Sequence, residues 1–158
     1  MTIIQRLTAA LLALTLCTGG GAALAEEPAG TDAPEGLLFV QSGTSFTVQG
    51  EILTVSGVAD TLYFTDKPER KAGILASQEF IALWDAGDML EDPPNAVLSV
   101  PGEDPFKVVL EIVAAPVPQG DGMSYAVKVL WGELPAGGGP CSLFVDSEIV
   151  NPQITDAD

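Results

Sequence analysis

A basic segment in a strongly acidic chain is the first place where the sequence could do chemistry. The chain holds 6 Lys and Arg residues against 22 Asp and Glu, and Lys67, Arg70 and Lys71 are half of its basic residues. Asp66 precedes them, and Pro68 stiffens the segment because proline fixes its own φ and keeps the preceding residue extended. A charged turn of this kind can be an internal clasp or an anion-binding surface.

A second proline-stiffened segment, 92–95, offers the basic turn an acidic counterpart. Asp92 and Asn95 can bond loop backbone groups with their side chains. Asp92 can also accept a charge-assisted hydrogen bond from Arg70. We expect Arg70 to tie the two segments together, with a binding role as the alternative. The residues of this clasp or binding site are Asp66, Lys67, Arg70, Lys71, Asp92 and Asn95.

Four carboxylates near the end of a predicted helix could hold a cation. They are Asp85, Asp88, Glu91 and Asp92, and negative charge at a helix C-terminus is mildly unfavourable. A Lys or Arg could balance them, and so could Ca²⁺, which accepts oxygen ligands in flexible geometry. Their spacing does not match the EF-hand loop. Calcium is therefore an alternative to a solvated acidic loop, and no other cofactor is expected.

The residue types exclude several catalytic chemistries. The chain has no histidine, so Ser-His-Asp and Cys-His hydrolysis and His-containing zinc sites are excluded. Cys141 lies beside an apolar run, which indicates a buried, inert thiol. Paired carboxylates could cut a glycosidic bond, but 22 acidic residues bring such pairs together by chance. We expect no enzyme, and a carboxylate-based hydrolase is a remote alternative.

The net charge of −16 limits the partners of the chain. Nucleic acids and anionic membrane surfaces both need a cationic footprint. The charge therefore disfavours these partners, and it is typical of a protein that must stay soluble outside the cell.

Short alternating segments predict a mainly β structure. Strand signals cover 37–41, 45–49, 51–56 and 61–65, and glycines separate them. Residues 106–114 and 123–131 each alternate apolar and other residues, and the turn residues 120–122 between them indicate a hairpin. Their other faces are partly apolar too, which favours a central pair of strands. Gly137 to Gly139 read as a flexible turn before a strand-like run at 142–145.

One helix interrupts the strands. Ser77 can cap it, Glu79 lies in its first turn, and Phe80, Ile81 and Trp84 form one apolar stripe that ends near Gly87. The predicted fold is mainly β: an antiparallel β-sandwich or β-roll with one short helix at about residues 77–86.

The two ends of the chain differ in character from its middle. Residues 1–25 have an apolar run and end in Ala-Leu-Ala, as a signal peptide does. We expect a disordered lead-in at 26–36, a single β-rich domain at 37–151 and a frayed acidic tail at 152–158. The protein is then exported, periplasmic or extracellular, with no integral membrane segment. Lipid anchoring at Cys17 is less favoured because Leu16 is bulky.

The chain resembles a family of uncharacterised secreted bacterial proteins over roughly residues 57 to 145. The resemblance rests on two elements. One is an aromatic-Asp-basic-Pro-x-Arg element, here within residues 64–70, and the other is an Asp-Pro-Pro-Asn-Ala element, here 92–96. It implies export and a shared fold, and it implies nothing about substrate. Cys141 departs from the family, in which a small residue is expected, and this weakens a functional role for the thiol.

These observations predict an exported noncatalytic β-domain whose basic turn at 66–71 is a structural clasp to an acidic loop. The alternative is a Ca²⁺-binding or ligand-binding module, with an envelope or extracellular protein as partner. Exposed aromatic side chains beside the basic turn would favour binding, and their burial would favour a scaffold.

Overall fold

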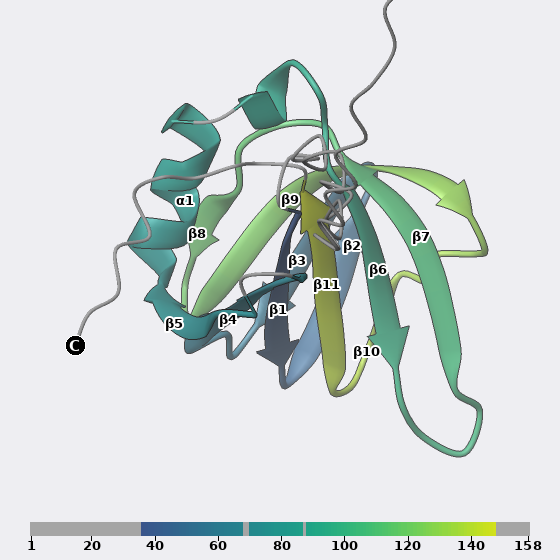
Figure 1. The fold of residues 1–158 in the computed structure, drawn as a ribbon. Helices are drawn as coiled ribbons and strands as arrows, with labels where there is room; N and C mark the ends of the chain where they lie inside the picture. Colours follow the sequence, from purple (N-terminus) through teal and green to yellow (C-terminus); the bar gives the residue numbers. More distant parts are fainter. Residues whose placement is uncertain (1–35, 68–69, 87, 148–158) are drawn as a thin grey trace, which may run out of the picture. The chain divides into compact units, whose positions relative to one another are not determined.

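The computed structural model describes residues 36–67, 70–86 and 88–147. The predicted signal peptide 1–25 and tail 152–158 lie outside the described residues, as do the predicted lead-in 26–36 except for residue 36 and the last four residues, 148–151, of the predicted domain. The elements in Figure 1 are β1 Leu37–Gly43, β2 Ser45–Gln49, β3 Ile52–Ser56, β4 Asp60–Thr65, β5 Ala72–Ala76, α1 Ser77–Ala86, the 3-10 helix η1 Asp88–Leu90, β6 Asn95–Val100, β7 Phe106–Ile112, β8 Val117–Gln119, β9 Gly122–Trp131, β10 Gly137–Gly138 and β11 Cys141–Ser147.

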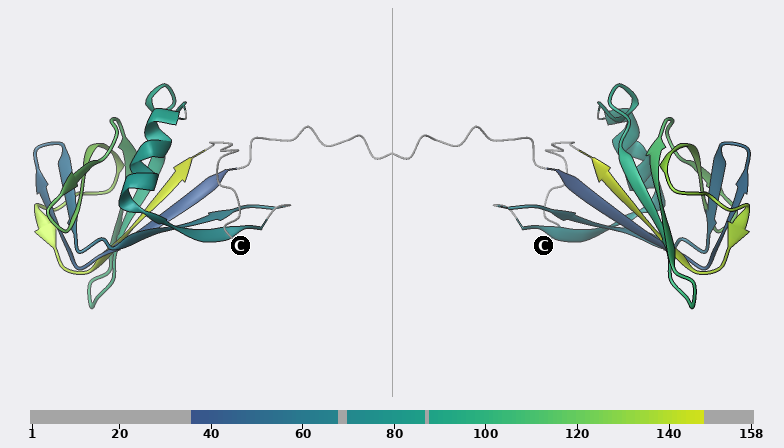
Figure 2. Two further views of the ribbon diagram at one scale, coloured as in Figure 1. Left: turned by 90° about the vertical axis from the view of Figure 1, so that its left-hand side faces the viewer. Right: turned by 90° about the vertical axis from the view of Figure 1, so that its right-hand side faces the viewer.

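The strands form one antiparallel sheet that does not close into a barrel, which confirms the predicted fold class. Their order is β10-β2-β3-β9-β7-β6-β11-β1-β4-β5, and β8 pairs with β9 off this path. Strand β9 pairs with β3 and β8 through its first half and with β7 through its second half. Figure 2 shows the sheet bent into two arms, with α1 over the opening between them.

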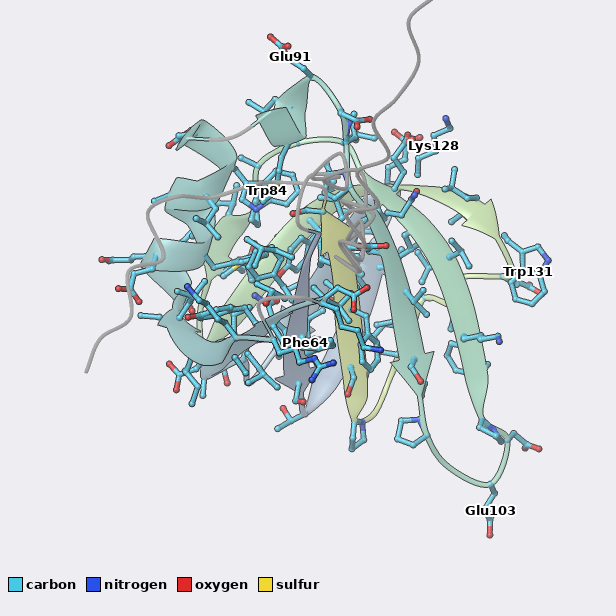
Figure 3. All side chains as sticks on the ribbon, viewed as in Figure 1. Phe64, Trp84, Glu91, Glu103, Lys128 and Trp131 are labelled. Carbon is cyan, nitrogen blue, oxygen red and sulfur yellow. The ribbon has the colours of Figure 1, made fainter. Side chains whose placement is uncertain are left out.

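The core lies between the two arms and under the helix. Phe80 and Trp84 of α1 are fully buried, and the ring of Phe80 packs edge-on against Phe39 of β1 with the centroids 5.2 Å apart. Figure 3 shows Trp84 turned in from α1 toward the sheet. The predicted helix is confirmed, but its capping contact differs. The carboxylate of Glu79 accepts a 2.8 Å hydrogen bond from the backbone N–H of Ala76, so Ala76 occupies the cap position that was predicted for Ser77.

The hairpin predicted between 106–114 and 123–131 is wrong in its connection. The turn at 120–122 joins β8 to β9, while β7 pairs directly with the second half of β9. The predicted apolar face of β9 is buried as far as Val127, but Val129 and Trp131 are 43% and 61% exposed. A register shift beside Val109 opposes Val109 to Trp131 and turns the Trp131 side chain to the other face, whereas Val129 stays opposite buried Leu110.

The glycine run before β11 is also more ordered than predicted. Gly137 and Gly138 form the short strand β10, which pairs with Thr47 and Phe46 of β2. A Cβ atom on Gly138 would lie 2.4 Å from the ring of Phe46. The missing side chain therefore allows this strand to lie close to the buried ring, and the run is not a free turn.

Gly122 allows β9 to start close against β3. A Cβ atom at this position would lie 1.9 Å from the carbonyl oxygen of Val55, and a backbone oxygen in a paired strand cannot move aside cheaply. We expect Gly122→Ala to lower the free energy of unfolding by about 1–3 kcal/mol, the usual cost of overpacking. Urea denaturation measures the change. Gly139→Ala is the control, because nothing lies within 4 Å of a Cβ atom there; equal stability of the two variants would contradict the prediction.

A buried polar chain connects β9, β1 and β4 across the core. The hydroxyl of Tyr125 donates to Oε1 of Gln41, and Nε2 of Gln41 donates to Oγ1 of Thr61 at 2.8 Å. All three side chains have no exposed surface. Buried polar groups are costly unless they are paired, so these bonds fix how the three strands sit relative to one another.

Burial raises the pKa of the Tyr125 phenol well above its usual range, because the charged form loses its water. A raised pKa in the folded state means that this group's contribution to stability is complete below its unfolded pKa of about 10 and is lost as the pH rises above that value. Tyr125→Phe should lower the free energy of unfolding at pH 7 by about 1–3 kcal/mol, because Oε1 of Gln41 is left buried without its donor. It should also flatten the decline in stability above pH 10. Urea denaturation at pH 7 and at several alkaline pH values tests both effects, and an unchanged alkaline slope would contradict the second.

Candidate functional site

The basic segment forms the turn between β4 and β5 and is closed by its own atoms. Oδ1 of Asp66 accepts a 2.7 Å hydrogen bond from the N–H of Lys67, and the N–H of Arg70 donates to the Asp66 carbonyl oxygen at 3.1 Å. The N–H of Lys71 donates to Oγ1 of Thr65 at 2.9 Å. These bonds lie within the turn, and the side chains of Lys67, Arg70 and Lys71 are exposed.

The structure does not bring the two proline-stiffened segments together through an ion pair. Arg70 and Asp92 are both described, and no salt bridge joins them. The ion pair found between described residues links Lys128 of β9 to Glu111 of β7, with 3.5 Å between Nζ and Oε2. Asn95, also placed in the clasp by the sequence, begins β6 and lies opposite Glu111 in the sheet.

The candidate calcium ligands follow the end of α1. Asp85, Glu91 and Asp92 are exposed, and Figure 3 shows Glu91 pointing away from the fold. The side chain of Asp88 lies outside the described part. Within that part, no three His, Cys, Asp or Glu residues gather in a way that could hold a metal ion.

A feature that the sequence analysis missed is an apolar row across the outer face of the sheet. Val40 on this face alternates with buried Phe39 and Gln41 on the inner face. Strand register places apolar residues from seven neighbouring strands directly opposite one another. The row, defined by its register partners, is Ile74, Leu62, Val40, Phe144, Val97, Val109 and Trp131.

The row is most exposed at its ends. Ile74 and Leu62 are 69% and 46% exposed, and Trp131 at the other end is 61% exposed. Phe64, in the adjacent register position beside Leu38, is 39% exposed and lies two residues from the basic turn. Figure 3 shows Trp131 projecting from the side of the sheet. With about 4.8 Å between neighbouring strands, the row is roughly 29 Å long.

Basic side chains border this row. Lys107 and Lys128 are exposed and alternate with buried Val108 and Val127, so they lie on the outer face. The basic turn adds its cations at the end of β4. Every Lys and Arg beyond Arg6 is therefore on the outer face or on the β4–β5 turn, although the chain as a whole is strongly acidic.

The outer face combines apolar and charged side chains. Its side chains offer apolar contact and charges of both signs. Glu111 is paired with Lys128, and Asp146, opposite Leu38, and Asp60 are exposed carboxylates on the same face. Cys141 lies on the inner side of the sheet, 3% exposed, as predicted for a buried thiol. Burial raises the pKa of this thiol, which keeps it protonated and unreactive.

The signal for the row was present in the sequence. Leu38, Val40, Leu62, Phe64 and Phe144 are apolar residues at positions where a strand with one solvated face would carry polar ones. Period-two patterning identifies the face of each residue. It does not say which strands are neighbours, so the row became visible only with the strand order.

Arg70 has a backbone φ of 51°, in the left-handed region that costs a non-glycine residue about 1–2 kcal/mol. We therefore expect Arg70→Gly to raise the free energy of unfolding by up to about 1 kcal/mol, after the entropy cost of glycine. Arg70→Ala should change it by less than about 0.5 kcal/mol, because the side chain is exposed. Thermal and urea denaturation measure both. If both variants lowered the free energy of unfolding by more than 1 kcal/mol, the Arg70 side chain would stabilise the fold as the clasp hypothesis predicted.

No helix among the described residues is long and apolar enough to cross a membrane. Comparison with protein-family models, with curated proteins and with solved structures finds no match to this chain. Its function must therefore be argued from its own residues.

Proposed function

We propose that this chain is an exported, noncatalytic binding module and that the outer face of the sheet, with the basic turn, is its binding surface. The observation that carries the proposal is the exposed apolar row beside the turn. Export is supported by the signal-like residues 1–25. The exposed Phe64 next to the turn favours binding over a scaffold role.

The exposure of the row is what separates it from ordinary surface. Single exposed apolar residues are common in soluble proteins, whereas contiguous apolar patches mark interaction sites. Here Ile74 and Leu62 are register partners, and Phe64 lies two positions along β4 from Leu62. The patch is therefore contiguous and rests on paired strands, so it is held in place before a ligand arrives.

The charge pattern specifies the kind of ligand. The basic turn beside the exposed Phe64 fits an acidic protein segment that also carries apolar side chains, because opposite potentials attract across an interface. An anionic membrane surface is a weaker candidate, since the net charge of −16 would repel the rest of the molecule from it. The partner that we propose is thus an acidic envelope or extracellular protein.

The dye 8-anilinonaphthalene-1-sulfonate tests this surface because it is both anionic and apolar. We expect the native protein to bind it and to increase its fluorescence. Phe64→Ser should weaken dye binding by about five-fold, since partial burial of a Phe ring is worth about 1 kcal/mol. Val117→Ser is the matched control, because Val117 is 59% exposed but belongs to β8, outside the row.

Near-ultraviolet circular dichroism must show that each variant keeps its tertiary structure. Two results would contradict the proposal: no dye binding by the native protein, or equal loss in the two variants. Sedimentation with phosphatidylglycerol vesicles forms the second arm. We expect the protein to stay in solution. Sedimentation with the vesicles would show that the ligand is a lipid surface and would contradict the proposed protein partner.

A further inference from the structure

Strand β5 is an edge that the fold leaves open on one side. It is the last strand in the sheet order and pairs with β4, and no described segment pairs with its other side. Natural edge strands usually carry a charged residue, a proline or a bulge that prevents pairing with another chain. The five residues Ala72 to Ala76 include none of these.

The hydrogen-bond pattern shows which backbone groups face this open side. The N–H of Thr65 donates to the carbonyl oxygen of Lys71, so these two residues form a hydrogen-bonded pair. Such pairs alternate along an antiparallel ladder, so Gly73 and Leu75 bond to β4. The backbone groups of Ala72, Ile74 and Ala76 then point away from it. The bond from the N–H of Ala76 to the Glu79 carboxylate agrees with this direction.

We propose that this edge pairs with the same edge of a second copy, antiparallel and centred on Ile74. Residue 74 then lies opposite residue 74, and Ala72 lies opposite Ala76 of the second copy. This register opposes the outward-facing backbone groups of the two strands, with the N–H of Ala76 in each copy already bonded to Glu79. It also satisfies the two-fold symmetry that most dimers have, because each copy contributes the same surface.

The pairing joins the apolar rows of the two copies. Residues directly opposite each other in an antiparallel pair lie on the same face, so the two Ile74 side chains would contact each other. Ile74 is 69% exposed, the highest value among the large apolar side chains described. Leu62 lies next to Ile74 in the same row, and the row would continue across the interface without interruption.

The charges at the two ends of β5 are complementary in this arrangement. The basic turn precedes Ala72 at one end. At the other end, Asp60 lies opposite Ala76 in the sheet, and the Glu79 carboxylate is bound at Ala76. Antiparallel pairing places the turn of each copy beside Asp60 and Glu79 of the other. Opposite charges then meet twice, which favours this orientation over a parallel one.

A second copy fits this edge better than an unrelated strand for this reason. One five-residue strand and its neighbours carry all the complementary groups. These are the outward-facing backbone groups, the exposed Ile74, a basic end and an acidic end. The pairing does not rest on the proposed binding role, because it uses the backbone edge of β5 and requires no ligand on the face, although Ile74 belongs to both surfaces.

Sedimentation equilibrium over a concentration series tests the dimer. We expect the wild-type protein to dimerise and Ile74→Lys to weaken the dimer by about ten-fold or more, since two like charges would oppose each other directly. Val117→Lys, at a comparably exposed apolar position on β8, should leave the dimer unchanged. A wild-type protein that remains monomeric, or equal effects of the two variants, would overturn the proposal.

Oxidation of Ile74→Cys tests the register. Hydrogen-bonded partners have Cα atoms about 5.5 Å apart, which a disulfide can bridge. We expect a covalent dimer of Ile74→Cys on a nonreducing gel and none of Val117→Cys. A wild-type dimer whose Ile74→Cys variant does not cross-link would show that the copies meet elsewhere, and this would also overturn the proposal. Failure in either experiment leaves the dye-binding test of the face unaffected.

Discussion

The buried chain from Tyr125 through Gln41 to Thr61 is the constraint on which the arrangement of strands depends. It links β9, which belongs to both arms of the sheet, to β1 and β4 on one arm. Apolar packing alone tolerates small shifts, whereas a buried polar group left without its partner costs a large fraction of a domain's stability. The hydrogen bonds therefore select one relative position of the arms. The residues of the outer row line up because each is the direct register partner of the next in neighbouring strands.

The sequence predicted the local elements better than their connections. The stripe of Phe80, Ile81 and Trp84 defined the helix, and alternation defined most strands correctly. Strand β5 was missed because Ala and Gly carry little strand preference. The register shift beside Val109 was not predictable, since an extra residue in one strand leaves no mark in a period-two pattern.

The candidate site was less predictable than the fold. The sequence singled out the basic turn, and the structure gives that turn internal hydrogen bonds and exposed cations instead of an ion pair to Asp92. The sequence does not show which strands are neighbours in the sheet. Trp131 and Ile74 are 57 residues apart in sequence, by the difference of their numbers, yet the register places them in one row. Only the strand order supplies that relation.

The place of β11 in the sheet has a consequence for how the chain folds. This strand is the last one described, yet it lies in the middle, between β6 and β1. Its pairing with β1 joins residues such as Leu37 and Ser147 from opposite ends of the domain. Contacts of such sequence separation slow folding, because loop-closure entropy is lost before they form. The sheet cannot be completed until almost the whole domain has been synthesised, so its first strands must wait for their last partner.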